Sequence, residues 1–185
     1  MKRNSVVLAI AIVFLGLTPL AARAQQNPVS SAVRMMLSRQ GKNLVAGAEE
    51  MPANKLNYAP TPAQMTFGHL MMHIAMSNMF LCSNIGGGKA PDLGHLTEHS
   101  PKARLLAAMK QSFSFCDQVL AKVNDGELDQ QVKFFGGRKI SKAAAMIALT
   151  NDMADHYAQE AIYLRLNGHL PPTAMPHHGM GMKKK

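Results

Sequence analysis

The sequence predicts an all-α fold: a four-helix bundle with a long crossover between its second and third helices. Four stretches of helical character are each bounded by residues that start or stop helices, and no stretch alternates apolar and polar residues as a half-buried strand does. Amphipathic helices must bury their apolar faces against one another, so a bundle is the natural packing. We expect helices over residues 28–50, 61–84, 101–123 and 141–167.

The first two helices have recognisable start signals. Asn27-Pro28 places an N-cap residue before a proline at the first helical position. Thr61-Pro62 has the spacing of a capping box and predicts the start of the second helix, reinforced by Thr66. Residues 67–82 are apolar on nearly all sides of that helix, which predicts that more than one neighbour buries it.

The second half of the chain has equally local signals. Serines begin the third helix (Ser100) and the fourth (Ser141), and Gly168 is expected as the left-handed C-cap of the fourth. Between these helices, residues 127–140 look irregular, with a short hairpin at Gly136-Gly137. The link over residues 85–101 can reach roughly 50 Å when extended, and a helix of about twenty residues spans only roughly 30 Å. The second and third helices are therefore predicted to run parallel.

The chain begins like an exported protein. Basic residues precede an unbroken apolar run over residues 6–17, and Ala22-Arg23-Ala24 is the small-x-small pattern that signal peptidase cuts. At about 1.5 Å per residue this run is too short to cross a hydrocarbon core of roughly 30 Å. We expect residues 1–24 to be a cleaved signal peptide, which predicts a periplasmic or secreted protein that begins near Gln25 and has no membrane anchor.

Cleavage would lower the formal charge of the chain from +9 to +6, because the segment holds three basic residues and no acid. The remaining chain has no cluster of Lys and Arg interleaved with aromatic residues, so we expect no nucleic-acid partner. Its length fits one domain, placed at residues 25–172, followed by a flexible tail rich in His, Met and Lys at residues 173–185.

Three side chains could bind a metal ion. His73 lies in the middle of the apolar second helix, and Asp152 and His156 project from one face of the fourth because they are four residues apart. Two imidazoles and one carboxylate form a three-ligand site that leaves positions open for water or substrate. The alternative is that His73 is a hydrogen-bonded core histidine and that the other two form an ordinary surface pair.

Two stretches resemble the DinB-like (damage-inducible) family of metal-binding four-helix bundles. The first runs from Met51-Pro52 through Thr61-Pro62 to the FGHLMMHIA segment at residues 67–75. The second runs from the HYAQ segment at residues 156–159 through YLRLNG to Pro171-Pro172. In order and spacing the resemblance covers most of residues 28–172, and it implies the same bundle fold.

The resemblance also implies a divalent metal ion, usually nickel or zinc, held by one histidine on the second helix and two on the fourth. His73 and His156 match two of these positions. Asp152 stands at the third, where the family has histidine, and Ala158 replaces the usual glycine. A carboxylate makes the site harder and less suited to nickel, so iron and manganese join zinc and nickel as candidates.

Two classes of function follow from this. The resemblance implies a metal-dependent hydrolase or thiol transferase, in which the metal lowers the pKa of a bound water or thiol, acting on an unknown small molecule. The small thiols that such transferases use are largely cytosolic, which argues against thiol transfer in an exported protein. The alternative is a non-catalytic periplasmic binding module, with either an empty bundle or a copper-binding Met/His surface.

Cys82 and Cys116 are predicted to form a disulfide. In an oxidising compartment, two cysteines on neighbouring helices indicate a bridge, and these two lie at similar depths if their helices run parallel. The alternative is two reduced thiols in the core.

Methionine and histidine recur along one side of the second helix and in the tail. Thioether and imidazole groups suit copper, but methionine also fills cores and adaptable interfaces. We interpret the helical stripe as packing or a homodimer surface; its members are Met65, His69, Met72, Met76 and Met79, and those of the tail are His177, His178, Met180 and Met182.

Overall fold

The computed structural model, which describes residues 27–176, contains four long α-helices. They are α1 (Pro28–Glu50), α2 (Phe67–Gly86), α3 (Lys102–Leu120) and α4 (Lys142–Leu166). Short elements join them: the 3₁₀ helices η1 (Ala53–Lys55), η2 (Asp125–Glu127), η3 (Phe135–Gly137) and η4 (Pro172–Ala174), and the antiparallel strands β1 (Gln131–Lys133) and β2 (Lys139–Ser141). The predicted signal peptide and residues 177–185 of the predicted tail lie outside the described residues.

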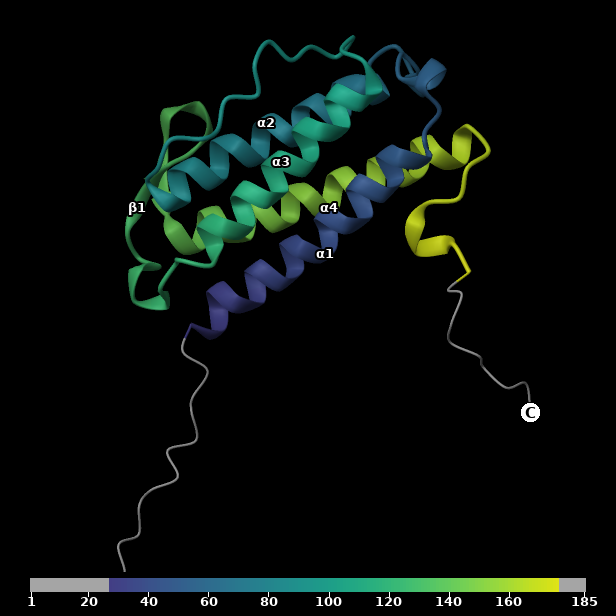
Figure 1. Ribbon diagram of the computed structural model, residues 1–185. Coiled ribbons are helices and arrows are strands. Elements are labelled where there is room, and N and C mark those ends of the chain that lie inside the picture. The colour runs from purple at the N-terminus through teal and green to yellow at the C-terminus, as the bar shows by residue number, and fades with distance from the viewer. Residues whose placement is uncertain (1–26, 177–185) are drawn as a thin grey trace, which may run out of the picture.

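The four helices form a bundle in which α2 and α3 run parallel, as predicted (Figure 1). The Asn78 amide donates to the Ser112 hydroxyl at 3.1 Å, and one turn further along both helices Cys82 meets Cys116. Because both contacts advance in the same direction, the link between these helices must return along the bundle. It does so as an extended strand-free segment above α2 and α3 (Figure 1).

The predicted disulfide is present in the structure. The Cα atoms of Cys82 and Cys116 lie 5.3 Å apart, and both side chains are completely buried. The bridge therefore ties the second half of α2 to the second half of α3.

Each helix of the bundle touches two others along its length. The order around the bundle is α1, α3, α2, α4, so that α2 is buried by both α3 and α4. This agrees with the nearly all-round apolar character of its sequence. The α1–α3 face lies on the opposite side of the bundle from the α2–α4 face. No helix within residues 27–176 is long and apolar enough to cross a membrane.

The predicted start of the second helix was wrong. Thr61 begins only an isolated turn, closed by the Gln64 amide donating to the Thr61 carbonyl at 3.1 Å. The helix starts at Phe67, where Thr66 is the N-cap and its hydroxyl accepts from the His69 amide at 3.1 Å. The reason is tertiary: the amide of Phe67 donates to the Tyr58 carbonyl, and the next amide, of Gly68, donates to another carbonyl of the preceding loop.

The other helices lie where predicted, with small shifts at the ends, but Ser100 does not cap the third helix, which starts at Lys102 after Pro101 and has no side-chain capping hydrogen bond. The helix α1 spans the predicted residues, and Ser141 caps α4 by accepting from the Ala144 amide at 3.2 Å. The third helix ends three residues before its predicted end, at Leu120. The hairpin β1–β2 turns at Gly136-Gly137, and Gly168 takes the expected left-handed conformation after α4 with φ 79°.

Candidate functional site

His73 of α2 and His156 of α4 meet where these two helices face each other. Their ring centroids are 4.9 Å apart and the ring planes are nearly perpendicular, at 82°. His156 is only 5% exposed, whereas His73 is partly open to solvent. Two histidines distant in the sequence are thus brought together at the surface of an otherwise apolar interface.

Asp152 lies beside His156, one turn earlier on α4. Its Oδ1 lies 3.4 Å from His156 Nε2, and about a third of the side chain is exposed. Within residues 27–176, however, no three His, Cys, Asp or Glu side chains are gathered as a complete set of metal ligands. The structure brings the three sequence-predicted residues together as two contacts, one between the rings and one between Asp152 and His156.

The protonation of His73 suits a ligand role. Burial lowers the pKa of His73, and the neighbouring His156 lowers it further, against the opposing effect of Asp152. A lowered pKa keeps the ring neutral at neutral pH, and the neutral ring is the form that binds metals. The Ser77 hydroxyl lies 3.3 Å from His73 Nε2, so His73 also has a hydrogen-bond partner, as the alternative interpretation required.

Several buried polar atoms around this pair have no hydrogen-bond partner in the described part of the chain. They include both ring nitrogens of His156 and Oδ2 of Asp152. Buried polar atoms are nearly always paired, and each one left alone costs about 1–3 kcal/mol. Imidazole nitrogens and a carboxylate oxygen are the donor types that a divalent metal ion uses, although within residues 27–176 these side chains are not gathered as a complete ligand set.

Glu160 extends the same row by one more turn, and the sequence interpretation missed it. Its side chain is completely buried, and neither carboxyl oxygen has a hydrogen-bond partner among residues 27–176. A Cβ placed on Gly47 of α1 would lie 2.6 Å from Glu160 Oε2, so glycine makes the room for this carboxyl. Burial raises the pKa of Glu160 well above its ordinary value. The four-residue spacing from His156 was the available signal.

A cavity of about 580 Å³ opens beside Asp152. Its wall combines apolar and acidic groups from α2, α4 and the segment after β1: Leu81, Phe134, Phe135, Ala148, Asn151, Asp152, Ala154 and Asp155. The ring of Phe135 is held in place by stacking on Phe80 of α2, with centroids 4.7 Å apart. A volume of this size is typical of small-molecule sites, and Asp152 connects it to the histidine pair.

The methionine stripe of α2 does not form one exposed surface. Met79 is buried, Met76 is 53% exposed, and His69 Nδ1 pairs with Glu98 Oε2 at 2.8 Å. Met79 is therefore packed in the bundle, Met65, His69 and Met72 are partly buried, and Met65 lies before the start of α2.

Known proteins share this architecture. The profile of the DinB superfamily matches residues 36–159. A DinB-like protein from Bacillus subtilis superposes with a TM-score of 0.62 at 21% identity, covering 78% of this chain and 95% of its own. A DinB-like protein from Bacillus cereus gives a TM-score of 0.64 at 16% identity, covering 77% and 95%. These structures show a common fold.

No curated protein matches the chain. The superfamily profile nevertheless spans well over half of the sequence, and both the histidine-bearing helices and the parallel α2–α3 arrangement lie within or beside the matched region. This protein therefore belongs to the DinB superfamily.

Proposed function

We propose that this protein is an exported metalloprotein that binds one divalent ion through His73, Asp152 and His156. The observation that carries the proposal is the contact between the two histidine rings, together with the ring nitrogens of the buried one, which have no hydrogen-bond partner among residues 27–176. Zinc and nickel suit the imidazoles, and iron and manganese tolerate the carboxylate.

In this proposal His73, His156 and Asp152 have separate roles. His73 stays neutral and can donate a nitrogen lone pair, His156 is rigidly placed in the α2–α4 interface, and Asp152 lies between the histidines and the cavity. A bound metal would supply Lewis-acid chemistry by lowering the pKa of a water or thiol. The cavity would hold a small molecule with an apolar part against Phe134 and Phe135. These roles fit a metal-dependent hydrolase or thiol transferase.

The metal proposal predicts bound ion and a chelator-sensitive fold. Protein purified without an affinity tag should contain one equivalent of divalent metal by elemental analysis. A ligand that binds only the folded state stabilises it by mass action, so a chelator should lower the melting temperature by roughly 5–10 °C. His156→Ala should abolish both the bound metal and the chelator effect. The matched control is His95→Ala, which removes an exposed histidine of the crossover and should change neither.

Asp152→His serves as the gain-of-affinity variant in the same experiment. It creates an all-imidazole ligand set, so we expect tighter binding and a shift in preference towards nickel. Metal-free wild-type protein with a chelator-insensitive melt would contradict the proposal and favour the binding-module alternative. Copper that is lost when residues 177–185 are removed would assign binding to the tail instead.

Export is part of the same proposal. The buried Cys82–Cys116 bridge supports it, because such bridges persist in oxidising compartments. The intact mass of protein recovered from the periplasm should correspond to a chain that starts at Gln25. Periplasmic protein that still carries Met1 would contradict the predicted cleavage.

A further inference from the structure

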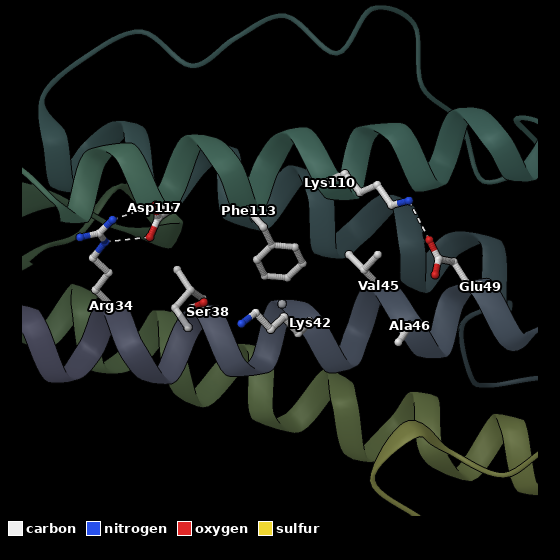
Figure 2. Close-up of a pocket in the computed structure, with 11 residues that line it drawn as sticks. Arg34, Ser38, Lys42, Val45, Ala46, Glu49, Lys110, Phe113 and Asp117 are labelled. Carbon is white, nitrogen blue, oxygen red and sulfur yellow. Dashed lines mark hydrogen bonds and ion pairs between the residues drawn. The ribbon is translucent and has the colours of Figure 1, made fainter. Parts of the chain in front are cut away.

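The helices α1 and α3 enclose a groove on the side of the bundle opposite the histidine pair. Its volume is about 400 Å³, within the range of small-molecule sites. The apolar lining consists of Leu37, Gly41, Val45, Ala46 and Phe113. Figure 2 shows the Phe113 ring projecting from α3 into the middle of this groove.

The groove exists because α1 presents small side chains to a large one. A Cβ on Gly41 would lie 2.8 Å from Cδ1 of Phe113, so the aromatic ring lies directly against the α1 backbone. Together with Ala46, this glycine leaves the ring as the main apolar surface between the two helices.

Both ends of the groove are closed by ion pairs that bridge α1 and α3. Arg34 donates twice to Asp117, at 2.7 and 2.9 Å, and Lys110 Nζ lies 2.7 Å from Glu49 Oε1 (Figure 2). The hydrogen bond from Arg34 lowers the pKa of the Asp117 carboxyl, so this pair stays ionised at neutral pH. The four charges therefore compensate one another and leave the ends neutral.

Unlike the other charged residues that line the groove, Lys42 takes no part in the two ion pairs between α1 and α3. Within residues 27–176 it has no ion pair, although it lies midway between the two bridged ends. Ser38 lies one turn before it on the same face of α1, and both side chains flank the Phe113 ring (Figure 2). An uncompensated ammonium and a hydroxyl beside an aromatic surface are complementary to an anion with an apolar body.

We propose that this groove binds a small amphipathic carboxylate, with its carboxylate at Lys42 and Ser38 and its apolar body along Phe113 and Val45. The ligand class follows from one unpaired positive charge, one hydroxyl and an elongated apolar wall. The site is independent of the metal proposal, because it lies on the opposite face of the bundle and shares no residue with the histidine pair.

Calorimetric titration with decanoate tests this proposal. Wild-type protein should bind decanoate at least tenfold more tightly than decan-1-ol, which has the same chain length without the charge. Lys42→Met should weaken decanoate binding at least tenfold, since a hydrogen bond to a charged group is lost. The matched control is Arg39→Met, which removes a charge from the same helix outside the groove and should leave the affinity unchanged.

A second variant tests how much the apolar wall of the groove contributes to decanoate binding. Ala46→Leu fills part of the groove while keeping Lys42, so it should also weaken decanoate binding, with the melting temperature reporting an intact fold. No decanoate binding at millimolar concentration, or equal affinities for Lys42→Met and wild type, would overturn the proposal. A dimer in sedimentation that Lys42→Met dissociates would overturn it too, because the groove would then belong to a second copy.

Discussion

Replacing Cys82 and Cys116 with alanine should lower the free energy of unfolding by about 3–4 kcal/mol. The bridge joins residues separated by 34 positions, and closing a loop of that length removes conformational freedom from the unfolded chain. At roughly 2–4 °C per kcal/mol for a chain of this size, the melting temperature should fall by about 10 °C. Urea unfolding of the wild type and the double variant measures the change.

Reduction provides the matched control for the disulfide. Dithiothreitol should destabilise the wild type by a similar amount and leave the double variant unaffected. A loss below about 1 kcal/mol would mean that the bridge does not constrain the unfolded chain as the entropy model requires. Two free thiols in denatured, non-reduced protein would contradict the bridge itself.

Glu160→Met should raise the free energy of unfolding at pH 7 by about 2 kcal/mol. The wild-type carboxyl is completely buried, and its oxygens have no hydrogen-bond partner within the described residues, which costs about 1–3 kcal/mol. Methionine fills a similar volume without polar oxygens. The melting temperature should rise by roughly 4–8 °C. A variant that is less stable than wild type would show that Glu160 has a partner that this interpretation overlooks.

The pH dependence distinguishes ionisation from packing at this position. Burial raises the pKa of Glu160 well above its ordinary value of 4.5, so on raising the pH the unfolded chain loses this proton first. The free energy of unfolding should therefore fall as the pH rises above 4.5, until the folded protein also ionises. Glu160→Gln keeps the size of the side chain and should remove this part of the pH dependence. An unchanged slope in Glu160→Gln would assign the dependence to other groups.

The number, order and direction of the helices were predictable from the sequence because their signals are local. Proline after Asn27, serine at 141 and glycine at 168 act on their own neighbouring amides and carbonyls, so they need no information from the rest of the chain. The length of the link over residues 85–101 allowed the parallel arrangement, and the two cysteines at matching depths agreed with it.

The candidate site was predictable only in part. The four-residue spacing of Asp152 and His156 follows from helix geometry, His73 was selected as a lone histidine in an apolar helix, and the resemblance to the DinB-like family implied that the three act together. Glu160 has the same spacing from His156 but was not among the predicted site residues, and its burial depends on Gly47 of α1, more than a hundred residues earlier. The cavity wall formed by Phe134 and Phe135 likewise depends on how the hairpin folds over α2.

The starts of α1 and α2 show which features local sequence signals set and which features contacts between distant residues set. Asn27 occupies the predicted cap position, but its side chain accepts from the Asp125 amide, and the Asp125 carboxylate caps α1 by accepting from Val29 and Ser30. The start of α2 was likewise set by loop carbonyls that accept from its first amides. By itself the sequence determined the helix content and allowed the parallel crossover, because these rest on short-range patterns and chain length, and the disulfide was predicted from two cysteines at similar depths on helices that run parallel. Only the tertiary structure decided the capping group of α1, the start of α2, the buried Glu160 and the α1–α3 groove, because each depends on side chains and backbone groups that are brought together from distant parts of the chain.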